Sequence, residues 1–429
     1  MRAVRRRERG AGGGTKEDVD RLNSTYPPLY HKAEAADPKP ETVRHEHGAS
    51  PAGLYIHVPF CRSKCPYCNF FSITQPEYIP KYIDALIGEL KLSRHVVGCA
   101  DSIYFGGGTP SVLTPNQIES VIAGLSSCFS ISADAEVTLE VNPGTVSQNR
   151  MADYRSIGIN RISIGLQSCV DRTLVFLGRI HTARQGRDTY HMARKAGFDN
   201  VGLDLIYALP GQSPQRWQAE MAQAVHMAPE HLSCYTLTIE PGTPLAGRIA
   251  AGEVTPLDEK TAGVLFSLTI DYLNRHGYRQ YEISNFARIG SDERVDRRSR
   301  HNRKYWNFAP YLGFGPAAHS FLDNKRWWNH PSVDDYLADI HAGRRPVVDE
   351  EVLTREQRII EAVYLGLRQT DGIDLEGFRS TFNEDFGARF EPRLSRLIDG
   401  EMIEKAPQRI RLTRRGMLFL EKVVERLLG

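Results

Sequence analysis

The chain has 429 residues, of which 41% are hydrophobic and 25% charged, so it is long enough for more than one globular domain. A net charge of +2 gives no strong attraction to nucleic acid or membranes, and no apolar run reaches the ~18 residues of a membrane-spanning helix. Seven cysteines, an odd number, are too few for a disulfide scaffold and favour metal-bound or free thiols in a reducing compartment.

Residues 1–50 differ in composition from the rest of the chain. The segment begins with MRAVRRRERGAGGG and then stays polar with scattered prolines, which predicts a disordered basic and polar leader. It lacks the apolar stretch of a secretory signal. Organelle transit peptides are also Arg-rich and acid-poor, but serine is sparse here and the glycine run would break an amphipathic helix. We therefore expect a cytoplasmic protein, with an organellar location as the less favoured alternative.

From residue 54 onward, short apolar runs alternate with helical patterns, as in a parallel α/β fold. Buried strands are predicted at 54–58, 102–105, 136–141, 161–166, 201–207 and 232–237. Between the first two strands, one helical face carries Ile79, Ile83, Leu86, Ile87 and Leu90. No GxGxxG follows the first strand, and distinctive polar residues follow strand ends, where βα barrels keep their sites. We therefore predict a partial (β/α)6 TIM-like barrel over residues 51–290.

The remaining chain is predicted to form two further regions. Residues 291–350 contain the end of a charged loop (288–300) and then an aromatic-rich connecting region. Residues 351–429 show three helices, two short strands (MIEKAP and RIRLT) and a last helix, a pattern that resembles a winged-helix module. Basic and acidic residues are nearly balanced there, so we expect a packing domain and no nucleic-acid partner.

Three cysteines stand close together in FCRSKCPYCNFFS, at Cys61, Cys65 and Cys68, with the spacing C-x3-C-x2-C. Structural zinc sites usually close four protein ligands, and no fourth cysteine lies nearby. Three thiolates on a [4Fe–4S] cluster would leave one iron open to a small molecule. His57 precedes the group on a predicted strand and fits a packed core residue equally well.

Polar residues follow the later strands in the same way. The glycines of FGGGTP (105–110) would let the backbone approach a ligand, although a tight turn explains them too. Glu140 lies inside an apolar strand, which is costly unless its carboxylate has a partner, such as a ribose diol or a structural arginine. Gln167, Arg179 and Asp204 also lie at or after strand ends. Each residue alone fits a structural role as well as a ligand-binding one.

The cysteine spacing directly after a first barrel strand resembles the radical SAM superfamily. The resemblance implies that Cys61, Cys65 and Cys68 hold a [4Fe–4S] cluster. It also implies that S-adenosylmethionine (SAM) chelates the fourth iron, where reduction yields a 5′-deoxyadenosyl radical. From about Leu54 onward, YIHVPFC, FGGGTP, EVNP, GLQS, DLIYALPGQ and GTPL resemble the oxygen-independent coproporphyrinogen III oxidase-like family. That resemblance implies SAM contacts at Tyr55, Tyr67, Gly107, Gly108, Thr109, Glu140, Gln167, Arg179 and Asp204, with Thr238 and, less firmly, His319 nearby.

Two features distinguish the members of this family. The dehydrogenases carry a fourth cysteine two residues after the third, whereas this chain has Phe70 at that position. The heme-chaperone group, HemW, has phenylalanine there and an H-N-x-x-Y-W motif, which HNRKYW (301–306) matches. The match implies that His301 offers an imidazole to heme iron and that Tyr305 and Trp306 offer flat faces to a porphyrin. From the chemistry alone, a surface histidine beside packing aromatics is an equal alternative.

The sequence therefore resembles a heme chaperone that binds a [4Fe–4S] cluster, SAM and heme and delivers heme to acceptors such as respiratory hemoproteins. Peripheral membrane association stays open, and the oligomeric state is not predicted. The alternative is a dehydrogenase that oxidatively decarboxylates coproporphyrinogen III. A third, less favoured hypothesis is a radical SAM enzyme that acts on heme itself. Two features depart from the chaperone pattern: the inserted GSDERVD (290–296) and the long leader, which brings the first cysteine to a dehydrogenase-like position.

Overall fold

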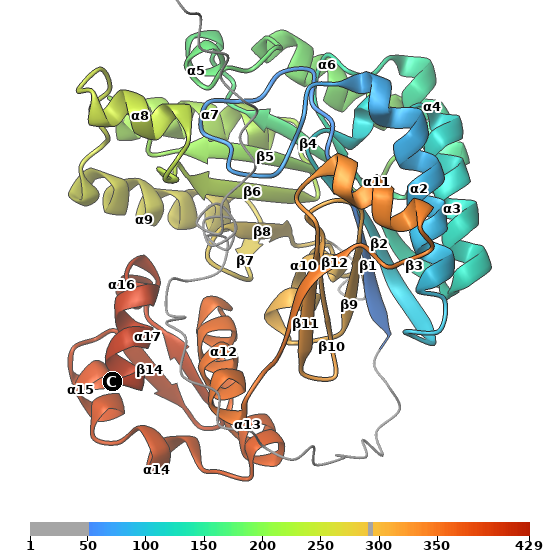
Figure 1. Cartoon of the computed structure of the whole chain (residues 1–429). Helices are drawn as coiled ribbons and strands as arrows, with labels where there is room; N and C mark the ends of the chain where they lie inside the picture. Colours follow the sequence, from blue (N-terminus) through green and yellow to red (C-terminus); the bar gives the residue numbers. More distant parts are fainter. Residues whose placement is uncertain (1–50, 291–294) are drawn as a thin grey trace, which may run out of the picture.

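The computed structural model describes residues 51–290 and 295–429. The predicted leader 1–50 and part of the inserted GSDERVD segment lie outside the described residues. The described chain forms a large α/β domain and a smaller C-terminal domain, which Figure 1 shows in red at the lower left. No described helix is both long enough and apolar enough to cross a membrane.

All six predicted parallel strands are present. They are β1 (Ala52–Val58), β2 (Cys99–Gly107), β3 (Ser130–Val141), β4 (Arg161–Gln167), β5 (Val201–Tyr207) and β6 (His231–Thr236). Each pairs in parallel with the next along the chain. The predicted partial barrel is confirmed, because side chains from β2 to β6 line one common cavity and the sheet must curve around it.

Helices cover the outer face of this sheet (Figure 1). The helices of this part of the chain are α2 (Ile79–Leu92), α3 (Pro115–Cys128), α4 (Gln148–Ser156), α5 (Asp171–Phe176), α6 (Ala183–Lys195), α7 (Pro214–His226), α8 (Pro244–Ala250) and α9 (Glu259–Arg275), with 3₁₀ turns at Pro76–Tyr78 and Pro110–Val112. The short α5 and α8 pack near the cysteine loop. Of the predicted apolar face of α2, Ile83, Leu86 and Leu90 are buried and Ile79 and Ile87 are half-buried. Two of these helices start with capping boxes, Thr114 with Gln117 and Thr182 with Gln185, which satisfy backbone N–H groups reciprocally.

The sheet continues beyond the barrel strands at both ends, in the order β12-β11-β10-β9-β1-β2-β3-β4-β5-β6-β8-β7. One extension is β7 (Tyr278–Gln280) with β8 (Asn285–Arg288), and the other comprises β9 (Tyr311–Phe314), β10 (His319–Leu322), β11 (Lys325–Asn329) and β12 (Val347–Val352). Strand β9 runs parallel to β1, so much of the predicted connecting region 291–350 belongs to the same sheet. Two helices accompany it, α10 (Arg300–Trp306) and α11 (Val333–His341).

The C-terminal domain has its own apolar core and a three-stranded sheet ordered β13-β15-β14. Its elements are α12 (Arg355–Arg368), β13 (Ile373–Asp374), α13 (Leu375–Phe382), α14 (Phe386–Phe390), α15 (Arg393–Asp399), β14 (Ile403–Ala406), β15 (Arg409–Leu412), α16 (Arg414–Leu418) and α17 (Leu420–Leu428). Its relation to winged-helix modules stays a prediction. An ion pair of 2.8 Å between Arg368 and Glu282 ties this domain to the barrel.

Candidate cluster and cofactor site

The three clustered cysteines lie in the loop that leaves β1 and leads to α2. Two backbone hydrogen bonds close the base of this loop, because Cys61 N donates to Ile73 O (2.9 Å) and Ile73 N donates to Pro59 O (2.7 Å). The loop is also held from outside, since Leu245 N donates to Pro66 O at 2.8 Å. The thiols are therefore presented by a fixed backbone at the carboxyl end of the first barrel strand.

Polar groups from distant strands reach the sulfur atoms. The Thr109 hydroxyl donates to Cys61 Sγ at 3.4 Å, and the Arg179 guanidinium donates to Cys65 Sγ at 3.5 Å. Burial raises the pKa of the Cys68 thiol. Hydrogen bonds to sulfur, such as those from Thr109 and Arg179, stabilise thiolate charge and tune iron–sulfur clusters. Three neighbouring thiols, two of which accept hydrogen bonds, therefore fit a [4Fe–4S] cluster with three protein ligands.

The FGGGTP loop packs directly against the cysteine loop. Gly108 N donates to Val58 O at 2.9 Å, so the two loops leave neighbouring strands side by side. Gly107 has a φ of +105°, and a Cβ there would lie 2.8 Å from the His57 ring. A Cβ on Gly108 would meet backbone oxygens at 2.9 Å and Cys61 Sγ at 3.1 Å. Both positions require glycine for this close approach.

Two half-buried carboxyl groups, Glu140 on β3 and Asp204 on β5, line the barrel interior. Glu140 accepts a hydrogen bond from the Tyr104 hydroxyl at 2.8 Å, and Asp204 accepts bonds from Ser163 at 3.1 and 3.3 Å. Burial, reinforced by the charge of Asp204, raises the pKa of Glu140 to about 8. Burial also raises the pKa of Asp204, against the hydrogen bonds from Ser233 and Ser163. The partner of Glu140 is thus a tyrosine and not the structural arginine considered above.

Arg179 links the cysteine loop to the middle of the sheet. Its guanidinium bonds to Gly165 O at 2.9 Å and to the Asn142 side chain, in addition to Cys65. The preceding Gly178 has a φ of +65°, and a Cβ there would lie 2.5 Å from Pro66. Glycine at 178 therefore lets the segment before Arg179 lie against the cysteine loop.

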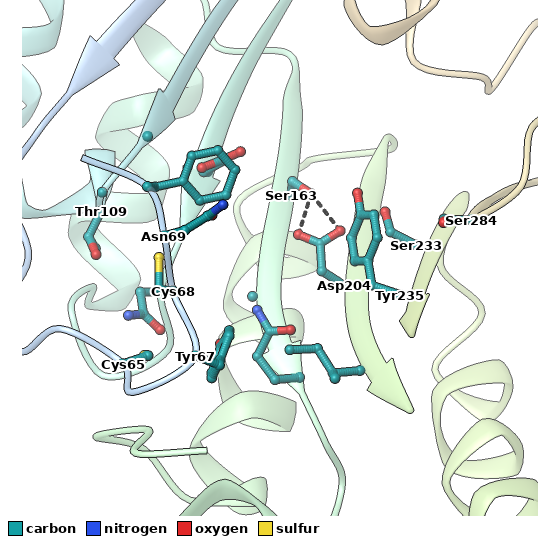
Figure 2. A pocket seen from close by; sticks show the side chains of 18 of the residues that line it. Cys65, Tyr67, Cys68, Asn69, Thr109, Ser163, Asp204, Ser233, Tyr235 and Ser284 are labelled. Carbon is teal, nitrogen blue, oxygen red and sulfur yellow. Dashed lines mark hydrogen bonds between the residues drawn. The ribbon is translucent and has the colours of Figure 1, made fainter. Parts of the chain in front are cut away.

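A cavity of about 710 Å³ unites these groups at the carboxyl ends of the strands. Figure 2 shows Cys65, Tyr67, Cys68 and Thr109 on one side of it and Asp204 on the other. The predicted residues that line it are Cys61, Cys65, Tyr67, Cys68, Gly107, Gly108, Thr109, Glu140, Gln167, Arg179, Asp204 and Thr238. The cavity volume is in the range of small-molecule sites.

The other predicted site residues do not line this cavity. Tyr55 lies behind it, with its ring 6.1 Å from the Tyr104 ring. His301 is buried, Tyr305 packs edge-on against Tyr311 with ring centroids 4.7 Å apart, and Trp306 packs under the Arg368 guanidinium at 4.6 Å. The aromatic side chains of HNRKYW are therefore engaged inside the protein, between the sheet and the C-terminal domain.

Several lining residues have no counterpart in the sequence analysis. Tyr104, Ser163, Ser233 and Tyr235 point into the barrel, and Arg368 and Glu421 reach the cavity from the C-terminal domain. Tyr104, Ser163 and Ser233 are polar positions inside apolar strands, so period-two alternation carries a signal for them. Arg368 and Glu421 lie on the amphipathic helices α12 and α17. Charged residues are common on the polar face of such helices, so the sequence does not distinguish these two.

Comparisons with known proteins agree with this geometry. The profile of the Radical SAM superfamily matches residues 55–223, and that of the HemN C-terminal domain matches residues 353–419. The chain is 32% identical to the Lactococcus lactis protein named "Heme chaperone HemW", over 88% of this chain and 97% of that one. It is 31% identical to the Bacillus subtilis protein of the same name, over 87% and 98%. The chain belongs to the HemW family.

Other relatives of this HemW-family chain extend the comparison. A bovine protein named "Radical S-adenosyl methionine domain-containing protein 1, mitochondrial" is 33% identical over 81% of this chain and 78% of that one. The solved structure of Escherichia coli coproporphyrinogen III oxidase (HemN) aligns with a TM-score of 0.77 at 23% identity, over 88% and 90% of the two chains. This structural similarity therefore supports the assignment of the fold. The radical SAM family implies a [4Fe–4S] cluster and SAM.

Proposed function

We propose that this HemW-family chain is a heme chaperone, which binds a [4Fe–4S] cluster, SAM and heme and delivers heme to acceptor proteins. The observation that carries the proposal is the near-full-length similarity to proteins named "Heme chaperone HemW". Phe70 agrees with it, because this residue stands where the family's dehydrogenases have a fourth cysteine. Its side chain is 51% exposed at the cavity.

The proposed cluster ligands are Cys61, Cys65 and Cys68. Among the residues that the structure describes, the other four cysteines lie outside the cavity lining, so the fourth iron would be left to SAM. Gly107, Gly108 and Thr109 would bring backbone groups to one side of SAM. Glu140, Gln167, Arg179 and Asp204 would supply polar side chains, and the further proposed contacts at the cavity are Tyr67 and Thr238. Tyr55 was also predicted to contact SAM, but its side chain lies behind the cavity, against Tyr104.

Heme is proposed to bind through HNRKYW, but His301 as it lies in the structure does not fit an iron ligand. Its side chain is 1% exposed, and both ring nitrogens have protein partners. Burial lowers the pKa of His301 to about 3, so the ring is neutral. A neutral imidazole has the right protonation state to bind iron. The buried ring of His301, however, is not accessible to a heme.

We propose a cytoplasmic location, as for a bacterial HemW protein, with acceptors among the respiratory hemoproteins. Nucleic acid is not proposed as a partner. Peripheral membrane association stays a proposal that rests on such acceptors. The bovine relative, whose printed name includes "mitochondrial", keeps the organellar alternative open.

The second candidate function is coproporphyrinogen III dehydrogenation, and the fold shared with HemN favours it. Two assays on anaerobically reconstituted protein separate the candidates. A heme titration should produce a Soret band at one heme per chain. Incubation with coproporphyrinogen III, SAM and a strong reductant should give no vinyl product by mass spectrometry. Stoichiometric vinyl product without heme binding would favour the dehydrogenase.

A further inference from the structure

The turn that follows β3, residues 142–145, connects neighbouring loops of the cavity wall. Its Asn142 lines the cavity and accepts a side-chain hydrogen bond from Arg179, whose guanidinium also donates to Cys65 Sγ at 3.5 Å. Within the turn, Thr145 N donates to Asn142 O at 3.1 Å. The turn is therefore connected through a single side chain to a proposed cluster ligand.

Two buried hydroxyl groups join this turn to the end of the FGGGTP loop. Ser111 follows that loop directly and is 0% exposed, and its Oγ lies 2.7 Å from Thr145 Oγ1. Asn142 N donates to Ser111 Oγ at 3.1 Å, and Thr145 Oγ1 donates to Asn142 O at 2.6 Å. Since each hydroxyl has one proton, Ser111 donates to Thr145, and the three residues form a closed ring of hydrogen bonds.

Arg150 on α4 holds the same two segments from behind the cavity wall. Its Nη1 donates to Thr145 O at 3.0 Å, and its Nη2 donates to Ser111 O at 3.1 Å. The Tyr154 hydroxyl, one turn further along the helix, lies 2.9 Å from Nη2 and donates to Leu113 O at 2.7 Å. The side chains of Ser111, Thr145 and Arg150 do not line the cavity.

We propose that Arg150, Ser111 and Thr145 form a positioning clasp, which holds Thr109 and Asn142 in place for the proposed cluster and SAM. The inference rests on the proposed cofactor site, since the clasp itself lies outside the cavity. Both held residues line the cavity, and Figure 2 shows Thr109 on the same side as the cysteine loop. Loss of the clasp should therefore loosen the cavity wall without removing a cofactor contact.

The clasp acts on the sulfur atoms through the residues that it holds. The Thr109 hydroxyl donates to Cys61 Sγ at 3.4 Å, and Asn142 orients Arg179 toward Cys65. A displaced donor weakens its hydrogen bond to sulfur, and such bonds help to set the reduction potential of iron–sulfur clusters. The clasp therefore affects SAM affinity and cluster potential together. A merely structural set of bonds would change only the free energy of unfolding.

The experiment compares SAM affinity and cluster potential in anaerobically reconstituted full-length protein and four variants. Thr145→Val replaces the hydroxyl with a methyl group of similar size, and Arg150→Lys keeps the charge but loses the second donor nitrogen. Thr145→Ser keeps the hydroxyl and should behave like the wild type. The matched control is Arg155→Ala, since Arg155 lies on the same helix but bonds to Gly197 O, and it should also match the wild type.

Both disruptive variants should keep the cluster, because all three cysteines remain. Thr145→Val and Arg150→Lys should weaken SAM binding in calorimetry roughly three- to thirtyfold, the effect of one lost hydrogen bond. Their cluster potential, measured by redox titration with EPR detection, should differ from that of the wild type. In the cofactor-free protein, amide hydrogen exchange should be faster in residues 109–113 and 142–145 and unchanged in α6.

The outcomes separate the inference from the proposed function. If the wild type binds SAM, and Thr145→Val and Arg150→Lys bind it equally well with an unchanged potential, the clasp inference is overturned and the cofactor site stands. If Thr145→Ser or Arg155→Ala weakens SAM binding as much, the inference also fails. If the cluster-containing wild type binds no SAM, the proposed cofactor site itself fails. A thermal melt checks folding, and Ser111→Ala replaces any variant that does not fold.

Discussion

The proposed contact between Glu140 and SAM predicts that SAM binding depends on pH, in a direction that the structure sets. Its pKa is raised to about 8, chiefly by burial, so the ligand-free protein holds this group mostly protonated at neutral pH. Ribose hydroxyls donate more strongly to a carboxylate than to a carboxylic acid, and the SAM sulfonium adds positive charge. SAM should therefore select the ionised form and release a proton on binding.

The size of the effect follows from that pKa. With a pKa of about 8, the ionised fraction rises from roughly one-thirtieth at about pH 6.5 to roughly three-quarters at about pH 8.5. The apparent dissociation constant for SAM should fall roughly twentyfold over this range. The assay is anaerobic calorimetry at several pH values on the reconstituted protein.

Glu140→Gln supplies the matched control, because the amide keeps the shape of the side chain but does not titrate. Its affinity for SAM should be lower than that of the wild type and should lack the part of the pH dependence that comes from Glu140. Subtracting the two pH profiles removes the titration of SAM itself and of every other group. Equal pH slopes in the two proteins would refute the assignment of Glu140 to the SAM site.

Two further predictions concern the cluster and the fold. Replacing Cys61, Cys65 or Cys68 by Ala should abolish the iron–sulfur absorbance after anaerobic reconstitution, and a wild-type protein that held only zinc would contradict the cluster. Glu89→Ala should lower the free energy of unfolding by about 3–5 kcal/mol in urea, because buried Glu89 accepts hydrogen bonds from Gly315 N, Asn329 and Tyr336; a loss under about 1 kcal/mol would contradict this.

The sequence predicted the barrel because its signals are local. Each buried strand appears as an apolar run, and the polar groups that follow the strands converge because parallel strands share one carboxyl edge. The lining of the cavity by Glu140, Gln167, Arg179 and Asp204 therefore follows from chain order alone. Glu140, Gln167 and Asp204 lie on β3, β4 and β5, and Arg179 lies in the segment between α5 and α6.

The contact between β2 and α10, where Ser102 meets His301, was not predictable in this way. Ser102 and His301 are separated by 199 positions in the chain. They meet only because β9 pairs with β1, which brings the preceding helix α10 next to the start of β2. Strand β9 is four residues long (YLGF), too short for a period to be read from the sequence. The sequence thus shows that His301 belongs to a motif, whereas its buried position depends on long-range packing.

The central claim is that this chain carries heme and passes it on. The most direct measurement mixes heme-loaded, cluster-containing protein with the apo form of a b-type cytochrome, separates the two and records the heme spectrum of each. The account predicts that heme moves to the cytochrome and that the released chaperone binds heme again. Heme that stays on the chain, or reaches the cytochrome no faster than free heme does, would contradict the account.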